Sequence, residues 1–139
     1  MSDPKHVEEA RRWLRYARED LATAASIVDT GSGVPRQACW LAQQAAEKGI
    51  KAALVFLEVD FPKTHDLDVL RNLLPWDWAI RIEPLDLSQL SEWAVEGRYP
   101  GDWADAMHGD AVQAVAVAKS VLEAVGNDLR RCGVTSEQF

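Results

Sequence analysis

The first 30 residues carry an apolar stripe with helical period. Apolar residues recur at alternating spacings of three and four, at Val7, Ala10, Leu14, Ala17, Leu21, Ala24 and Val28. This spacing predicts one face of a helix of about seven turns. Ser2 or Asp3 is the expected N-cap, Pro4 the first helical residue, and Gly31-Ser32-Gly33 the end. The charged residues on the other faces are expected to face solvent, with a phosphate-binding arginine stripe as the alternative.

Two more long helices are predicted. One spans about residues 36–57, follows Pro35 and is crowded with small residues, namely Ala38, Ala42, Ala45, Ala46, Gly49, Ala52 and Ala53. Small residues allow close helix contact, so this is the predicted central helix of a bundle. The other spans about residue 104 or 110 to residue 131, where a second stripe consists of Val112, Val115, Ala118, Leu122, Val125 and Leu129.

Shorter elements are expected between the second and the last long helix. A short helix is predicted over residues 63–74, with Thr64 or His65 near its N-cap, and another over residues 86–96, ended by Gly97. Residues 75–78 are expected to form a turn or loop. No segment alternates with a period of two. The sequence therefore predicts an all-α, antiparallel up-and-down bundle of three long and two short helices, as a single domain ordered over about residues 4–132 with a short tail.

Composition narrows the possible functions. The chain has 139 residues, 47% hydrophobic and 27% charged, which is typical of one globular domain and excludes a wholly disordered chain. Its net charge of −7 lies mostly in residues 62–139, and an acidic surface disfavours broad binding to nucleic-acid backbones. No membrane span or secretory signal is apparent, so a cytoplasmic location is expected. Of the two cysteines, Cys39 is expected to be an inert core thiol.

Candidate chemistry concentrates on the predicted central helix. His6, His65 and His108 are scattered singly, so no metal site is expected, and no motif predicts a cofactor. The central helix carries five polar residues among its small ones, at Gln43, Gln44, Glu47, Lys48 and Lys51. They form either a polar flank that faces solvent or a dimer partner, or the wall of a polar cleft.

Three blocks of sequence resemble a known family. Residues 39–52 (CWLAQQAAEKGIKA), 62–67 (PKTHDL) and 97–100 (GRYP) occur in the order found in HEPN-domain proteins of the stand-alone prokaryotic type, and the likeness extends from about residue 13 to the last helix. The resemblance implies a helical bundle, a homodimer with a cleft between its two copies, and a small nucleotidyltransferase partner, in some systems as toxin and antitoxin. It predicts a nucleotide- or RNA-associated accessory protein.

Many HEPN domains are metal-independent ribonucleases, which gives a second hypothesis. Those members use an arginine to hold the phosphate and a histidine, four to six residues later, to help transfer the proton of the ribose 2′-hydroxyl. The nearest pair here is Arg98 and His108, with nine residues between them that include Pro100 and Gly101. The pair cannot share a helical face as that motif requires. A ribonuclease toxin is therefore the alternative, and a non-catalytic dimerisation module is another.

The resemblance also implies ligand-binding positions, which are Gln43, Lys48, Lys51, His65, Asp66, Arg98 and Tyr99. Lys48 and Arg98 are the two cations expected to hold a phosphate in one cleft. Each position has a structural alternative. Asp66 could cap the short helix and His65 could bond a backbone carbonyl, while Arg98 and Tyr99 could pack their loop against the central helix.

Overall fold

The computed structural model describes residues 4–134, which contain six helices. Their bounds are α1 (Pro4–Thr30), α2 (Pro35–Phe56), α3 (Leu67–Arg71), α4 (Ala79–Ile82), α5 (Ser88–Glu96) and α6 (His108–Arg131). The predicted all-α fold is confirmed. The N-cap expected at Ser2 or Asp3, and residues 135–139 of the expected tail, lie outside the described residues.

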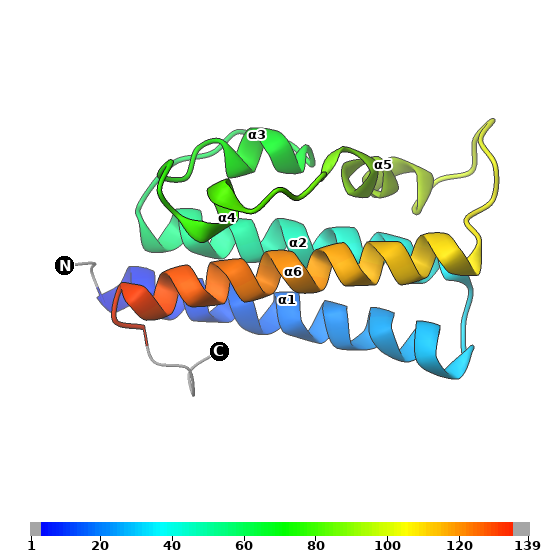
Figure 1. Ribbon diagram of the computed structural model, residues 1–139, viewed down its shortest axis with the longest axis horizontal. Helices are drawn as coiled ribbons and strands as arrows, with labels where there is room; N and C mark the ends of the chain where they lie inside the picture. Colours follow the sequence, from blue (N-terminus) through cyan, green and yellow to red (C-terminus); the bar gives the residue numbers. More distant parts are fainter. Residues whose placement is uncertain (1–3, 135–139) are drawn as a thin grey trace.

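The three long helices lie side by side, and the short ones form a layer over them (Figure 1). α1 and α2 run in opposite directions, and α6 runs in the same direction as α2. The segment with α3, α4 and α5 carries the chain back along the bundle, so it takes the place of a fourth antiparallel helix. α2 packs against α1, α3, α5 and α6, which makes it the central helix, as its small residues predicted.

Close packing around α2 depends on its small side chains. Ala38, Ala42, Ala45, Ala46, Ala52 and Ala53 are fully buried. A Cβ on Gly49 would overlap the side chain of Leu122 on α6. The small-residue stripe is therefore the surface on which the neighbouring helices approach the central one.

A buried carboxylate organises the start of α4. Asp128 of α6 is fully buried, and its carboxylate accepts hydrogen bonds from the backbone N–H of Ala79 at 2.7 Å and of Ile80 at 3.1 Å. Arg131 pairs with the same carboxylate. A carboxylate in this position satisfies backbone donors that the helix itself cannot, so Asp128 serves as the cap of α4 from another helix.

The starts of α3 and α6 differ slightly from the sequence prediction. α3 begins after Asp66, whose Oδ1 accepts from the backbone N–H of Asp68 at 3.0 Å and of Val69 at 3.3 Å. The N-cap is therefore Asp66, as its structural alternative predicted, and Thr64 and His65 directly precede it. α6 begins at His108, between the two expected starts.

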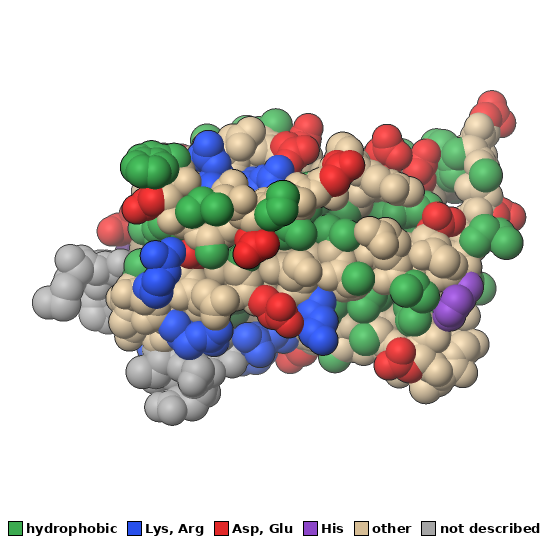
Figure 2. Space-filling model, in the orientation of Figure 1, with side chains coloured by type: hydrophobic (Ala, Val, Ile, Leu, Met, Phe, Trp, Pro, Cys, Tyr) green, Lys and Arg blue, Asp and Glu red, His purple; other side chains and the backbone are tan. Residues whose placement is uncertain are grey.

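Charge is unevenly spread over the surface. Residues 62–107, which include the α3–α5 layer, hold nine Asp and Glu against four Lys and Arg. Figure 2 shows acidic side chains along this layer and over the loop before α6, while basic side chains gather near the end of α6. Within residues 4–134, no helix is both long and apolar enough to cross a membrane.

Candidate functional site

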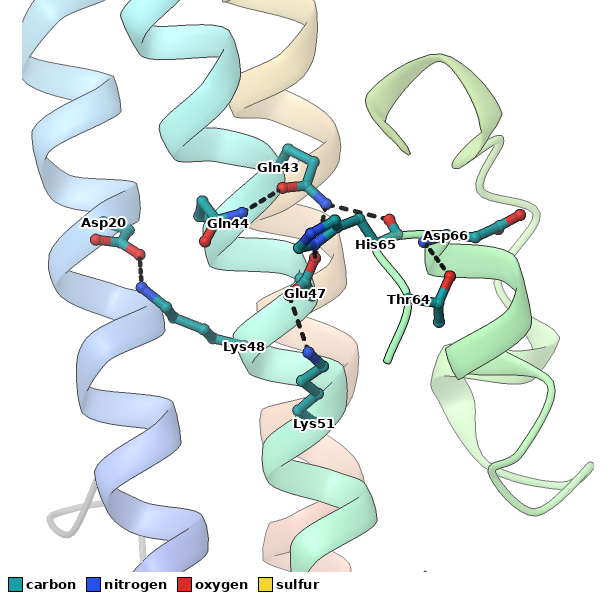
Figure 3. Close-up of polar contacts among 9 residues, drawn as sticks. All are labelled: Asp20, Gln43, Gln44, Glu47, Lys48, Lys51, Thr64, His65 and Asp66. Atoms are coloured by element: carbon teal, nitrogen blue, oxygen red, sulfur yellow. Dashed lines mark hydrogen bonds and ion pairs between the residues drawn. The ribbon is translucent and has the colours of Figure 1, made fainter. Parts of the chain in front are cut away.

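The carboxylate of Glu47, near the middle of α2, is the centre of a buried polar network (Figure 3). Its side chain is only 7% exposed. Oε1 accepts from Gln43 Nε2 at 3.0 Å and lies 2.8 Å from His65 Nδ1, and Oε2 lies 3.0 Å from Lys51 Nζ. Three donors thus surround one carboxylate, which is what a buried charge requires.

The surroundings of Glu47 favour its ionised form. Burial alone raises the pKa of this carboxyl group. The hydrogen bonds from Gln43, His65 and Lys51, together with the positive charge of Lys51, outweigh burial and hold the pKa of Glu47 below its ordinary value. Glu47 is therefore a carboxylate at neutral pH.

Gln43 connects this carboxylate to the loop before α3. Its side chain is fully buried, and Nε2 donates both to Glu47 and, at 3.2 Å, to the backbone carbonyl of His65. Its Oε1 accepts from Gln44 Nε2 at 2.7 Å. The expectation of a polar flank that faces solvent is wrong for Gln43 and Glu47, because the loop before α3 covers them.

His65 is held at Nδ1 and exposed elsewhere. An ionised carboxylate can only accept, so the 2.8 Å contact requires Nδ1 to carry the proton. The side chain is 59% exposed, and no hydrogen bond from residues 4–134 reaches Nε2. The ring therefore bonds the Glu47 carboxylate, and the backbone carbonyl considered from the sequence is not its partner.

The two lysines of α2 have different partners. Lys51 pairs with Glu47, and its Nζ lies 5.3 Å from the centroid of the Phe61 ring. Lys48 instead pairs with Asp20 of α1 at 2.6 Å. It lines a surface groove of about 370 Å³ together with Glu9, Arg12, Trp13 and Tyr16.

A second groove joins α1, the start of α2 and the end of α5. It measures about 480 Å³ and is lined by Thr23, Ile27, Arg36, Gln37, Trp40, Leu41, Gly97 and Arg98. Arg36 Nη1 donates to the Gly97 carbonyl at 2.9 Å, which ties the end of α5 to α2. A Cβ on Gly97 would lie 2.8 Å from Trp40 Cβ, so this close approach requires glycine.

The structure separates several residues that the sequence grouped together. Lys48 and Arg98 line different grooves, so the expectation that they share one cleft is wrong within this chain. The groove of Arg98 includes Arg36, and Lys48 lies twelve residues further along α2, about 18 Å along the axis. Arg98 and His108 make no contact with each other in the described part of the chain. Arg98 instead lies 5.1 Å from the centroid of the Tyr99 ring.

Arg36 and Trp40 are site residues that the sequence reasoning missed. Both lie on the predicted central helix, but nothing local indicates that Arg36 meets a loop residue 61 positions later. Asp66, in contrast, is engaged as the cap of α3, which was its structural alternative. In residues 4–134 no three His, Cys, Asp or Glu side chains gather as a metal site would need.

Cys39 is a core thiol, as expected from the sequence. It is fully buried, and burial, with the nearby charge of Asp110, raises its pKa to about 12. A thiol with such a pKa holds almost no thiolate at neutral pH, so it is not a nucleophile.

Comparison with known proteins identifies the family. The HEPN domain model matches residues 10–129, so the chain belongs to the HEPN-domain family. The chain is similar to TT1696 from Thermus thermophilus, with 27% identity and a TM-score of 0.71 over 87% of this chain and 98% of that one. It shares its fold with ST0689, an archaeal HEPN homologue, at 24% identity and a TM-score of 0.63, over 85% and 95% of the two chains. No curated protein matches it.

Proposed function

We propose that this protein binds a nucleotide, or a nucleotide within RNA, in the groove between α1, α2 and α5, as the accessory partner of a small nucleotidyltransferase. One observation carries the proposal. Two arginines, Arg36 and Arg98, and the half-buried indole of Trp40 line the same groove. Guanidinium groups recognise phosphate, and an indole offers a surface on which a base can stack.

The size of the groove and the distribution of charge support a small ligand. A volume of about 480 Å³ lies within the range of sites for small molecules. The chain as a whole carries a net charge of −7, which opposes contact with a long phosphate backbone. Two arginines at one place can still hold a single phosphate group. The groove therefore favours a mononucleotide or one nucleotide of a flexible strand over a duplex.

Membership of the HEPN family supports the proposed partners. We infer that the protein forms a homodimer and associates with a small nucleotidyltransferase, as a module of toxin–antitoxin type. Affinity purification of the tagged protein from its native host, followed by native mass spectrometry, tests both inferences. We expect a complex that contains two copies of this chain and the nucleotidyltransferase. Recovery of the monomer alone would contradict both.

Ligand binding is tested by isothermal titration calorimetry with AMP, ATP, GTP and a short oligouridylate. Arg36→Gln and Arg98→Gln each remove one guanidinium group from the groove. Lys119→Gln removes one charge from an exposed position on α6 and is the matched control. A charge-assisted hydrogen bond contributes about 1.5–3 kcal/mol, so each groove variant should raise Kd roughly tenfold or more, while Lys119→Gln should not. Equal Kd values in all variants, or no binding by the wild type, would refute the proposal.

A further inference from the structure

The network around Glu47 exposes one reactive atom, Nε2 of His65, that is not part of the proposed nucleotide groove. Gln43 and Lys51 both donate to the buried Glu47 carboxylate, and His65, whose side chain is 59% exposed, contacts the same carboxylate (Figure 3). We propose that His65 is a nucleophile that accepts a phosphoryl group at Nε2, while Glu47 holds Nδ1. This inference concerns a different place in the fold from the proposed nucleotide groove and does not depend on it.

The contact with Glu47 determines which nitrogen can react. Because the carboxylate is ionised and accepts the Nδ1 proton at 2.8 Å, the lone pair of the neutral ring is on Nε2. The negative charge beside Nδ1 also stabilises the positive charge that develops on the ring when Nε2 forms a bond. A histidine nucleophile needs a neighbouring group that orients its ring, and Glu47 is that group.

The ring is held in place by more than one contact. Gln43 Nε2 donates both to the Glu47 carboxylate and to the backbone carbonyl of His65, so side chain and main chain are fixed by the same pair of α2 residues. Gln43 is fully buried and the side chain of Glu47 is 7% exposed, whereas that of His65 is 59% exposed. A rigid, buried support therefore carries an accessible ring, which is the arrangement that preorganises a reactive group.

The proposed reaction balances without a further reagent. The lone pair of Nε2 attacks the phosphorus of a phosphoryl donor, such as a nucleoside triphosphate, an acyl phosphate or a phosphoramidate, and a P–N bond forms. The bond between phosphorus and the leaving group breaks, and its electron pair departs with that group. Nε2 has no proton to lose. The proton on Nδ1 stays on that nitrogen and remains hydrogen-bonded to the Glu47 carboxylate. The product is an Nε2-phosphohistidine whose ring charge is balanced by the Glu47 carboxylate.

Nearby charges are compatible with a phosphoryl group. Lys51 balances the charge of Glu47, and exposed Lys63 lies two residues before His65 on the same loop. Asp66, the neighbouring acidic residue, is engaged by two backbone N–H groups of α3. The loop thus carries a positive side chain two residues from His65, and the carboxylate of Asp66 accepts hydrogen bonds from the start of α3.

Chemical phosphorylation with potassium phosphoramidate tests the proposal, because the other two histidines are internal controls. His6 pairs through Nε2 with Glu58, and His108 is exposed at the start of α6. The wild-type protein is treated at pH 8, and the rate at each histidine is measured by peptide mass spectrometry under alkaline conditions. We expect His65 to be labelled at least tenfold faster than His108. A rate at His65 equal to or below that at His108 would overturn the proposal.

Glu47→Gln tests the role of the carboxylate, and Glu58→Gln is the matched control. The first variant should lower the labelling rate of His65 to about that of His108, and the second should leave it unchanged. An unchanged rate at His65 in folded Glu47→Gln would overturn the proposal. If that variant does not fold, the wild type is labelled in urea instead. There the rates at His65 and His108 should become equal, and a persistent advantage for His65 would show that the fold does not cause it.

Discussion

Replacement of Glu47 by glutamine should destabilise the protein far more than an exposed Glu→Gln change. The variant keeps the shape of the side chain and an oxygen that can accept from Gln43 and His65. It loses the negative charge and places an amide NH₂ group where Oε2 now accepts from Lys51 at 3.0 Å. Lys51 is only 13% exposed, so its ammonium group would keep little contact with water.

The expected loss follows from the bonds that change. A hydrogen bond to a charged group contributes about 1.5–3 kcal/mol, and one such bond is lost outright while that to His65 is weakened. We therefore expect Glu47→Gln to lower the free energy of unfolding by about 2 kcal/mol at pH 7. Glu58→Gln is the matched control, because Glu58 is exposed and pairs with His6 at the surface, where such pairs contribute about 0–1 kcal/mol.

Urea unfolding followed by circular dichroism measures both variants, and pH provides a second test. The pKa of Glu47 in the folded protein lies below its ordinary value of 4.5. Its contribution to stability is therefore complete above pH 4.5 and is lost as the pH falls through the folded pKa. The difference between wild type and Glu47→Gln should shrink below pH 4.5. A loss at pH 7 no larger than that of Glu58→Gln, or a difference that grows in acid, would refute the reasoning.

Three further predictions concern the frame of the bundle and its thiols. Asp128→Ala leaves the first backbone N–H groups of α4 without a partner and should lower the free energy of unfolding by about 2 kcal/mol in urea titrations. Gly97→Ala puts a Cβ 2.7 Å from a backbone oxygen and should cost about 1–3 kcal/mol in the same assay, whereas Gly109→Ala, which meets nothing within 4 Å, should cost nothing. Ellman's reagent at pH 8 should modify exposed Cys132 in the folded protein and reach Cys39, whose pKa is about 12, only after unfolding.

The fold could be predicted from local pattern except where distant residues decide it. The apolar stripes of α1 and α6 and the small residues of α2 are periodic within each helix, and most of their residues are buried or half-buried. Val112 is the exception: it was predicted in the stripe of α6 but is 46% exposed, and Ala111 and Ala114 are buried there instead. α4 was not predicted, because it is only four residues long and its cap, Asp128, lies 48 or more residues away in sequence. When the residue that caps a helix lies on another helix, the sequence around the capped helix does not show where it begins.

The members of the polar network around Glu47 were predictable from the sequence, but their contacts were not, and Arg36 and Trp40 of the groove were missed. Glu47 and Lys51 are four residues apart on one helix, so their pairing follows from helical geometry. The contact of His65 with Glu47 depends on the path of the loop before α3, and the proximity of Arg36 to the end of α5 depends on how that helix packs on α2. Local spacing carries no information on either contact, or on the fact that Lys48 and Arg98 line different grooves of this chain.

The central claim is that a nucleotide lies against Trp40, between Arg36 and Arg98, and ¹H–¹⁵N NMR of the side chains tests it directly. The six tryptophans give six indole signals, with Trp40→Phe to assign the one in the groove. Titration with ATP should shift the signals of the Trp40 indole and the Arg98 guanidinium group. Trp76, which is 79% exposed but lies outside the groove, should not respond. A shift at Trp76 without one at Trp40, or unchanged spectra at millimolar ATP, would contradict the account.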